Sequence, residues 1–166
     1  MSKGQTVLAI LLLLSIVSCF LPWITAKVRI NGADHSTTNY GYDYIVPLGA
    51  PYTTSVSILN VLGFILSAFS FKVWQRIARL SPEEKDTEQG IQETFKATRR
   101  IRRLNAIAGI LILIGVIAAF IYTSDAAIAK ATGSVSYSVS VSAEYGMGLE
   151  ALFGFLLIII GARTEV

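Results

Sequence analysis

Four long apolar runs decide what this chain can fold into. They lie at about residues 6–25, 53–74, 105–123 and 146–162 of the 166-residue sequence. A helix needs about 20 mostly apolar residues to cross a bilayer, and backbone groups in lipid are satisfied only within helices or closed barrels. The sequence therefore predicts a single membrane domain over residues 1–166, an all-α integral membrane protein built as a four-transmembrane-helix bundle.

The composition agrees with a membrane protein and narrows the possible chemistry. Hydrophobic residues make up 53% of the chain and charged residues 15%, whereas a soluble domain has about 25% charged residues. There is one cysteine, Cys19, and one histidine, His35. An intrachain disulfide and a CxxC motif are therefore excluded, and His35, in the segment GADHSTTN, is expected to be a solvated loop residue.

The basic residues indicate how the bundle is oriented. Eleven of the 14 lysines and arginines fall in or beside the loop at 75–104 or near the two chain ends. Basic residues concentrate on the cytoplasmic side of membrane proteins. We therefore expect both termini and this loop in the cytoplasm, with outer loops at 26–52 and 124–145. Trp23 and Tyr145 mark outer helix ends, where interfacial aromatic residues are enriched.

Strict alternation indicates a strand between the third and fourth apolar runs. In SVSYSVSVSAEYG, residues 134–146, valine, tyrosine and alanine alternate with serine, which is typical of a half-buried β-strand. Residues 27–30 and 40–46 also alternate, and Asn31-Gly32 is a turn signal, so we expect a small extracellular β-sheet. Either the strands of the first outer loop or a partner protein covers the apolar face of the long strand. Its candidate partner surface consists of Tyr137, Val139, Val141 and Tyr145.

The order of these elements resembles that of claudins and, in outline, that of tetraspanins. A first span, an outer loop with strands, two spans joined in the cytoplasm, a further outer strand and a fourth span follow one another. The Trp-Gly-Leu-Trp motif and the cysteine pair of claudins are absent from residues 26–52, and the loop cysteines of tetraspanins are absent too. The resemblance implies a claudin-like architecture and carries over no functional residue.

The cytoplasmic loop is expected to form a helical hairpin stalk. SPEE, residues 81–84, combines a serine cap, a proline at the first helical position and a glutamate that closes a capping box. A helix that continues into the third span follows, with an interruption near Gly90. Basic residues beside a span pair with lipid headgroups, and the candidate headgroup contacts are Arg99, Arg100, Arg102 and Arg103. A docking site for a cytoplasmic protein is the alternative, and no nucleic-acid partner is expected.

Glu150 is the one acidic residue within the four apolar runs. A carboxylate within a span is costly and suggests a function by default, but Glu150 lies about one helical turn, roughly 6 Å, from the outer end of its run. Asn60 lies in the outer half of the second run and is expected to hydrogen-bond to it. We interpret the pair as a structural polar clamp, with an ion or proton role and a contact with a partner subunit as alternatives.

Elimination narrows the function to two main classes. Haem, metal and serine-nucleophile sites need paired histidines, clustered ligands or a base beside the serine. The sequence offers none of these, so we expect no cofactor and no enzyme activity. We interpret the chain as a non-catalytic integral membrane subunit or scaffold of the cell membrane, held in the lipid bilayer and bound to other membrane or surface proteins or to itself. An oligomeric channel or transporter that uses Glu150 is the alternative. The scarce cysteine and frequent isoleucine, tyrosine and serine resemble archaeal proteins.

Overall fold

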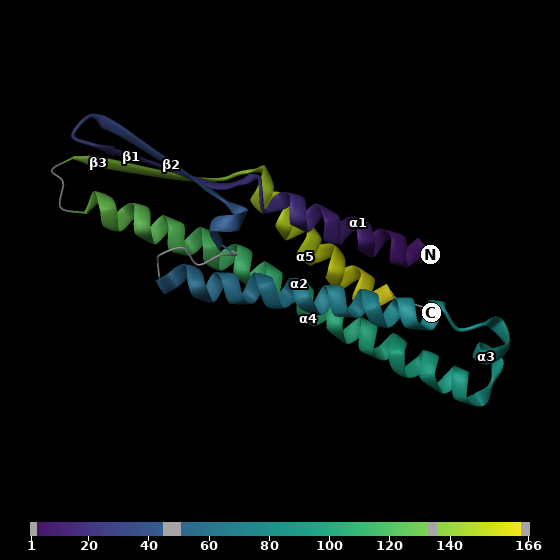
Figure 1. Ribbon diagram of the computed structural model, residues 1–166. Coiled ribbons are helices and arrows are strands. Elements are labelled where there is room, and N and C mark those ends of the chain that lie inside the picture. Colours follow the sequence, from purple (N-terminus) through teal and green to yellow (C-terminus); the bar gives the residue numbers. More distant parts are fainter. Residues whose placement is uncertain (1–2, 45–50, 133–135, 164–166) are drawn as a thin grey trace.

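The computed structural model describes residues 3–44, 51–132 and 136–163 (Figure 1). Its elements, in chain order, are α1 (Lys3–Ser18), β1 (Pro22–Ile30), β2 (Ala33–Tyr40), the short 3-10 helix η1 (Gly41–Tyr44), α2 (Pro51–Ala78), α3 (Pro82–Asp86), α4 (Glu88–Ala131), β3 (Tyr137–Ala143) and α5 (Tyr145–Arg163). The protein is mostly helical and carries one three-stranded sheet.

Three helices are long and apolar enough to cross a membrane. They are α2 from Val56 to Ala78, all of α4 and all of α5, and they indicate association with a membrane. α1 is apolar but shorter, since its 16 residues extend about 24 Å at 1.5 Å per residue. The run expected to form the first span, 6–25, is helical only to Ser18, and its last residues belong to strand β1.

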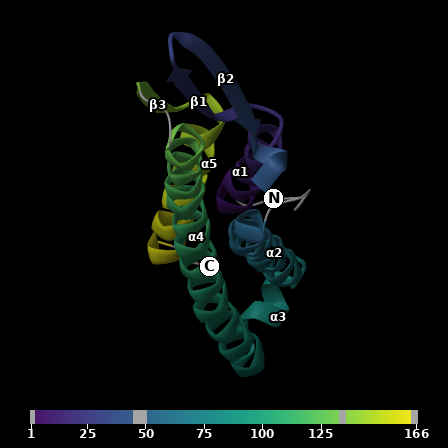
Figure 2. The same cartoon turned by 90° about the vertical axis from the view of Figure 1, so that its left-hand side faces the viewer.

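α4 is the central helix of the bundle. Figure 2 shows it between α5 and α2, and α1 packs mainly against α5. The sheet lies at one end of the molecule, and α3 lies at the other, toward which both ends of the chain point (Figure 1). The 44 residues of α4 extend about 66 Å, about twice the thickness of a hydrocarbon core. α4 therefore extends beyond a bilayer on at least one side.

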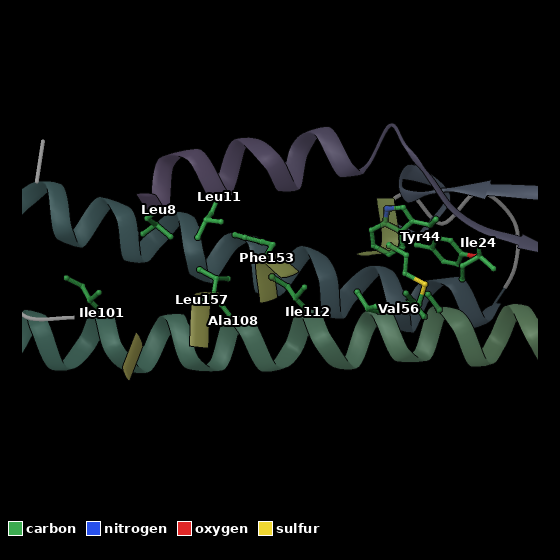
Figure 3. Packing of buried hydrophobic residues seen from close by; sticks show 14 of the residues in the cluster. Leu8, Leu11, Ile24, Tyr44, Val56, Ile101, Ala108, Ile112, Phe153 and Leu157 are labelled. Atoms are coloured by element: carbon green, nitrogen blue, oxygen red, sulfur yellow. The ribbon is translucent and has the colours of Figure 1, made fainter. Parts of the chain in front are cut away.

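The core between the helices is apolar and closely packed. Figure 3 shows side chains of α1, α4 and α5 facing one another, among them Leu8, Leu11, Ala108, Ile112, Phe153 and Leu157. Small residues bring the backbones together: a Cβ at Gly109 of α4 would collide with the carbonyl oxygen of Gly154 in α5. Gly63 of α2 packs in the same way on Ile112. Close packing is the main attraction between helices in lipid.

The sheet has the strand order β2-β1-β3, and both pairings are antiparallel. The expected turn at Asn31-Gly32 is confirmed as the two-residue loop between β1 and β2. Its φ angles of 49° and 87° are the positive values that a tight hairpin turn requires. The strand expected at 27–30 is confirmed within β1, and the alternating segment at 134–146 is confirmed as a strand over Tyr137–Ala143.

The strand expected at 40–46 is wrong over most of its described part. Gly41–Tyr44 forms the 3-10 helix η1, and residues 45–46 lie outside the described residues. The second strand is β2 instead, whose sequence ADHSTTNY has no apolar alternation. β2 lies at the edge of the sheet and is mostly exposed. Its backbone is satisfied by pairing with β1, and this pairing leaves no trace in the pattern of side chains.

The apolar face of the sheet lies on α4. Ala26 and Val28 of β1 pack with Ala127 and Ala131 of α4, and the valines of β3 contact this cluster. α4 reaches the sheet because it continues to Ala131, beyond the end of the third apolar run at Thr123. The sequence of this extension, SDAAIAKA, is rich in alanine, which favours helix and leaves room for the sheet. A helix of the same chain thus covers the valine face.

Trp23 joins the sheet to the helices. It is fully buried at the start of β1, whereas the sequence suggested a place at the membrane surface. Its ring stacks on Tyr44 with 5.5 Å between ring centroids, and its Nε1 donates a hydrogen bond of 2.9 Å to the carbonyl oxygen of Ser18. A Cβ at Gly41 or Gly146 would collide with the indole. The two glycines therefore make the space that the indole fills.

The SPEE segment forms the predicted capping box at the start of α3. The Ser81 hydroxyl accepts from the Glu84 backbone N–H at 3.2 Å, and the Glu84 carboxylate accepts from the Ser81 N–H at 2.8 Å. These hydrogen bonds hold the pKa of Glu84 below its usual value. The break before α4 falls at Thr87, which caps that helix, and Gly90 lies within its first turn.

Ala127→Asp is expected to detach the sheet from α4. The side chain at 127 is buried against Ala26 and Val28, so an aspartate there would be an unpaired buried charge, which costs about 3–5 kcal/mol. Limited proteolysis of the detergent-solubilised protein should then cut the strands much faster than in the wild type. Ala129→Asp is the matched control, because Ala129 is exposed on the same turn of helix. Equal cleavage of both variants would show that this face does not hold the sheet.

Candidate functional site

Glu150 is buried near the sheet end of the bundle, with 4% of its surface exposed. Its carboxylate faces α1, where Ser15 Oγ lies 2.9 and 3.0 Å from the two carboxylate oxygens and Ser18 Oγ lies 2.5 Å from Oε2. Ser15 and Ser18 are three residues apart and share one face of an apolar helix. Because a buried carboxylate is tolerated only when it is hydrogen-bonded, the two hydroxyls make its burial possible and fasten α1 to α5.

The two serine hydroxyls have fewer hydrogens than short contacts. Ser18 Oγ lies 2.7 Å from the carbonyl oxygen of Ser15 and also beside the Glu150 carboxylate. A hydroxyl donates a single hydrogen. The Ser18 hydroxyl therefore donates either to the carbonyl oxygen of Ser15 or to the Glu150 carboxylate at any moment. With glutamine at position 150, the amide Nε2 could donate to Ser18 Oγ, and the Ser18 hydrogen would then be left for the carbonyl oxygen of Ser15.

Asn60 does not form the hydrogen bond expected with Glu150. It is 4% exposed, and among the described residues neither its Oδ1 nor its Nδ2 has a hydrogen-bond partner. The amide lies against Gly115 of α4, where a Cβ would collide with Oδ1. Asn60 therefore presents a buried donor and a buried acceptor that the chain leaves unsatisfied, which is costly.

A cavity of about 300 Å³ is lined by both Asn60 and Glu150. It lies among the end of α1, the turn after α1, η1, α2 and α5. Apolar and aromatic side chains such as Ile16, Phe20 and Phe64 form most of its wall, and the Cys19 side chain also lines it. The exposed wall is almost wholly apolar, because both polar atoms of the Asn60 amide are covered and lie against α4.

The candidate outer partner surface is divided between two environments. Val139 and Val141 are half-buried against the cluster on α4, whereas Tyr137 and Tyr145 are exposed. The opposite face of the sheet is polar and turned away from α4. We name it the polar sheet face; its rows across β2, β1 and β3 are Asp34, Arg29 and Ser138, then Ser36, Lys27 and Ser140, then Thr38, Thr25 and Ser142.

Lys27 lies at the centre of the polar sheet face. Arg29 Nε and Asp34 Oδ1 form a salt bridge of 2.8 Å across β1 and β2. Lys27 lies between Ser36 and Ser140, and within the described ranges it has no acidic partner. A single unpaired charge among hydroxyl groups gives this face a chemical preference for an acidic group.

The candidate headgroup residues are all exposed on the α3 half of α4; they are Arg99, Arg100, Arg102 and Arg103. The guanidinium of Arg100 lies 5.0 Å from the ring centroid of Phe69 in α2, which is within cation–π range. This contact draws one cation toward the apolar part of α2. The other guanidinium groups remain accessible to solvent or to phosphates.

In the part of the chain that the structure describes, no three histidine, cysteine, aspartate or glutamate side chains are grouped so that they could hold a metal ion. No protein-family model matches the chain, and no curated protein matches its sequence.

Sequence reasoning missed the partners that matter most at this site. Ser15 and Ser18 are three residues apart, so they lie on one face of a helix that is otherwise mostly apolar. Two hydroxyls on one face of an apolar run are the sequence signal that could have indicated a polar partner on another helix. The burial of Trp23 has no comparable signal, because Gly41 and Gly146, which admit it, belong to distant segments.

The double change Ser15→Ala with Ser18→Ala is expected to destabilise the bundle by about 3 kcal/mol or more, since hydrogen bonds to charged groups are worth about 1.5–3 kcal/mol each. Glu150→Gln should cost little, because its amide can donate to Ser18. Thermal unfolding in detergent measures both. Ser70→Ala is the matched control, because Ser70 is buried in the bundle and its hydroxyl has no hydrogen-bond partner. If the serine double change were no more harmful than Ser70→Ala, the contact with Glu150 would contribute nothing.

Proposed function

We propose that the chain is a four-pass protein of the cell membrane that acts as a non-catalytic subunit or scaffold. Its outer sheet binds another membrane or surface protein, and its helix faces bind lipid or further subunits. The observation that carries this proposal is the position of the sheet, which stands on the end of α4 and turns its polar face away from the bundle.

The position of α1 supports a fourth span. α1 lies beside α5 and is joined to it through Glu150, and both ends of the chain point toward the α3 end (Figure 1). Its outer side chains, such as Leu13 and Ile16, are apolar and exposed, as lipid contacts would be. A helix shorter than the hydrocarbon core is accommodated by local thinning of the bilayer. With the basic residues inside, this arrangement leaves both termini and α3 in the cytoplasm.

The likeness to claudins is part of the same proposal. The order of helices and strands supports it, as does the pairing of β3 with a strand from the first outer loop. The likeness rests on this order, since the diagnostic motifs are absent from the sequence. It adds weight to a role in protein contacts over a role in catalysis.

The chemistry of the polar sheet face indicates the kind of partner. Lys27 is the unpaired cation at its centre, and serine and threonine hydroxyls surround it. Hydroxyls adapt to many hydrogen-bond partners, whereas a charge selects its opposite. The surface therefore fits a polar protein surface with an acidic side chain placed opposite Lys27.

Transport through Glu150 has weaker support. On the α3 side of Glu150 a layer of apolar side chains is almost fully buried, namely Leu8, Leu11, Ile112, Phe153 and Leu157, and the polar side chains Ser67, Ser70 and Asn105 are buried on α2 and α4. An ion or proton route would need polar groups or water through this layer. Flux through reconstituted vesicles that Glu150→Gln abolishes would favour transport over the scaffold.

Lys27→Glu should weaken recovery of the native partner. Tagged protein purified from native membranes in mild detergent should carry a stoichiometric partner, and the charge reversal should reduce that recovery about tenfold, which corresponds to about 1.4 kcal/mol. Lys130→Glu is the matched control, because Lys130 is exposed on α4 outside the polar sheet face. A wild type that purifies alone as a symmetric oligomer, unchanged by Lys27→Glu, would contradict the proposal.

Cysteine labelling should find β2 and α4's first turn on opposite sides of the membrane. In a Cys19→Ser background, Thr37→Cys should react in intact cells with an impermeant thiol reagent. Glu88→Cys should react only after the cells are permeabilised. Both positions are exposed in the structure, so the membrane alone decides their access. Labelling of Glu88→Cys in intact cells would overturn the proposed orientation.

A further inference from the structure

The face by which α4 packs on α5 continues beyond the end of α5. A Cβ at Gly161, in the last turn of α5, would collide with the backbone of Arg102 in α4. α5 ends soon after this contact, whereas α4 runs on toward α3 (Figure 2). Residues three or four apart share a helix face, and from Arg102 this face continues through Thr98, Phe95 and Ile91. α4 therefore extends a helix-packing face past the helix that covers it.

A groove of about 690 Å³ runs along this extension. We name it the α4 groove; among its lining residues are Lys85, Ile91, Phe95, Thr98, Arg99 and Arg102. Its apolar side chains are strongly exposed, since Phe95 has 70% of its surface accessible and Ile91 has 59%. Large apolar side chains one turn apart on an exposed helix face are typical of a surface that binds another helix.

The α4 groove extends beyond the depth of lipid. The third apolar run begins at Asn105, and at 1.5 Å per residue Phe95 lies about 15 Å and Ile91 about 21 Å from it along the helix axis. The polar headgroup layer on each side of a bilayer is about 5–8 Å thick. In the proposed four-pass arrangement both side chains therefore stand in water beyond the headgroups, and contact with lipid does not account for them.

The charges of the α4 groove select an acidic occupant. Lys85, Arg99 and Arg102 line it, and none of its described lining residues is acidic. Neither Lys85 nor Arg99 forms a salt bridge with another described residue. A second copy in the same membrane would place its own Arg99 and Arg102 at the same depth, so like charges would face one another. An acidic partner meets no such repulsion.

We propose that the α4 groove binds an acidic amphipathic helix of a partner protein on the α3 side of the membrane. The apolar face of that helix packs on Ile91 and Phe95, and its carboxylates pair with Lys85 and Arg99. From Ile91 to Arg102 the groove extends about 16 Å, the length of about three helical turns. The proposal rests on the four-pass arrangement and goes beyond the partner proposed for the outer sheet, because the sheet and α3 lie at opposite ends of the molecule (Figure 1).

Photocrosslinking from the α4 groove in native membranes tests the proposal. Phe95→benzoylphenylalanine keeps an aromatic side chain in the groove, and irradiation should link it to a protein other than this chain. Mass spectrometry of the linked peptide should find a helix-forming segment with apolar residues three or four apart and a net negative charge. Adding Arg99→Glu should reduce the linked product about tenfold, because it places like charges opposite each other. Lys96→Glu should leave the yield unchanged; it is the matched control, because Lys96 is exposed within one turn of Arg99 but lines a different groove, between α2 and α4.

Three other products would overturn the proposal: a link to lipid, a link to a second copy of this chain, or a link to a segment without acidic residues. Absence of any link, or a yield that Arg99→Glu leaves unchanged, would overturn it as well. Because Phe95 and Arg99 are exposed, neither change should unfold the protein, and thermal unfolding in detergent checks this. None of these outcomes bears on the outer sheet, whose partner is tested separately through Lys27→Glu.

Discussion

The hydrogen bonds from Ser15 and Ser18 to Glu150 fix the position on which the rest of the sheet end depends. α1 is apolar over most of its surface, so the hydrophobic effect alone gives it little preference for one rotation or depth in a bilayer. A buried carboxylate without donors is expensive, and this cost disappears only when the two serines face α5. The polar contact therefore adds a directed constraint on the register of α1 to the packing of Leu8 and Leu11 in the core.

The position of α1 then sets the position of the sheet. The carbonyl of Ser18, at the end of α1, accepts the indole hydrogen of Trp23, and β1 begins beside this residue. Trp23 stacks on Tyr44, whose hydroxyl lies 2.7 Å from Thr123 Oγ1 on α4. A chain of contacts thus leads from the carboxylate in the bundle, through one indole, to the helix on which the sheet rests. Each link is a directed polar or aromatic contact, so the sheet has one defined orientation.

Features encoded by neighbouring residues were predictable from the sequence, and features that join distant segments were not. The long apolar helices, the Asn31-Gly32 turn and the Ser81–Glu84 capping box depend on local spacing, and the structure contains all three. The edge strand β2 depends on pairing with β1, and its side chains carry no pattern. The serine donors to Glu150 can be identified only when it is known which helix lies beside α5. From the sequence, the amide of Asn60 is the expected partner of Glu150. The structure instead places the hydroxyls of Ser15 and Ser18 beside the carboxylate.

Trp23 also connects the cavity with the sheet. It lines the cavity beside Glu150, and it is the first buried residue of the central strand. A molecule in the cavity would change the orientation of the sheet only if its affinity differed between two positions of the Trp23 indole. By the same thermodynamic linkage, a partner bound to the sheet would then alter the affinity of the cavity by an equal factor. Because Gly41 and Gly146 enclose the indole closely, its alternative placements are few. The sheet is therefore held on the bundle in one orientation, and a change in that orientation would require the indole to leave this space.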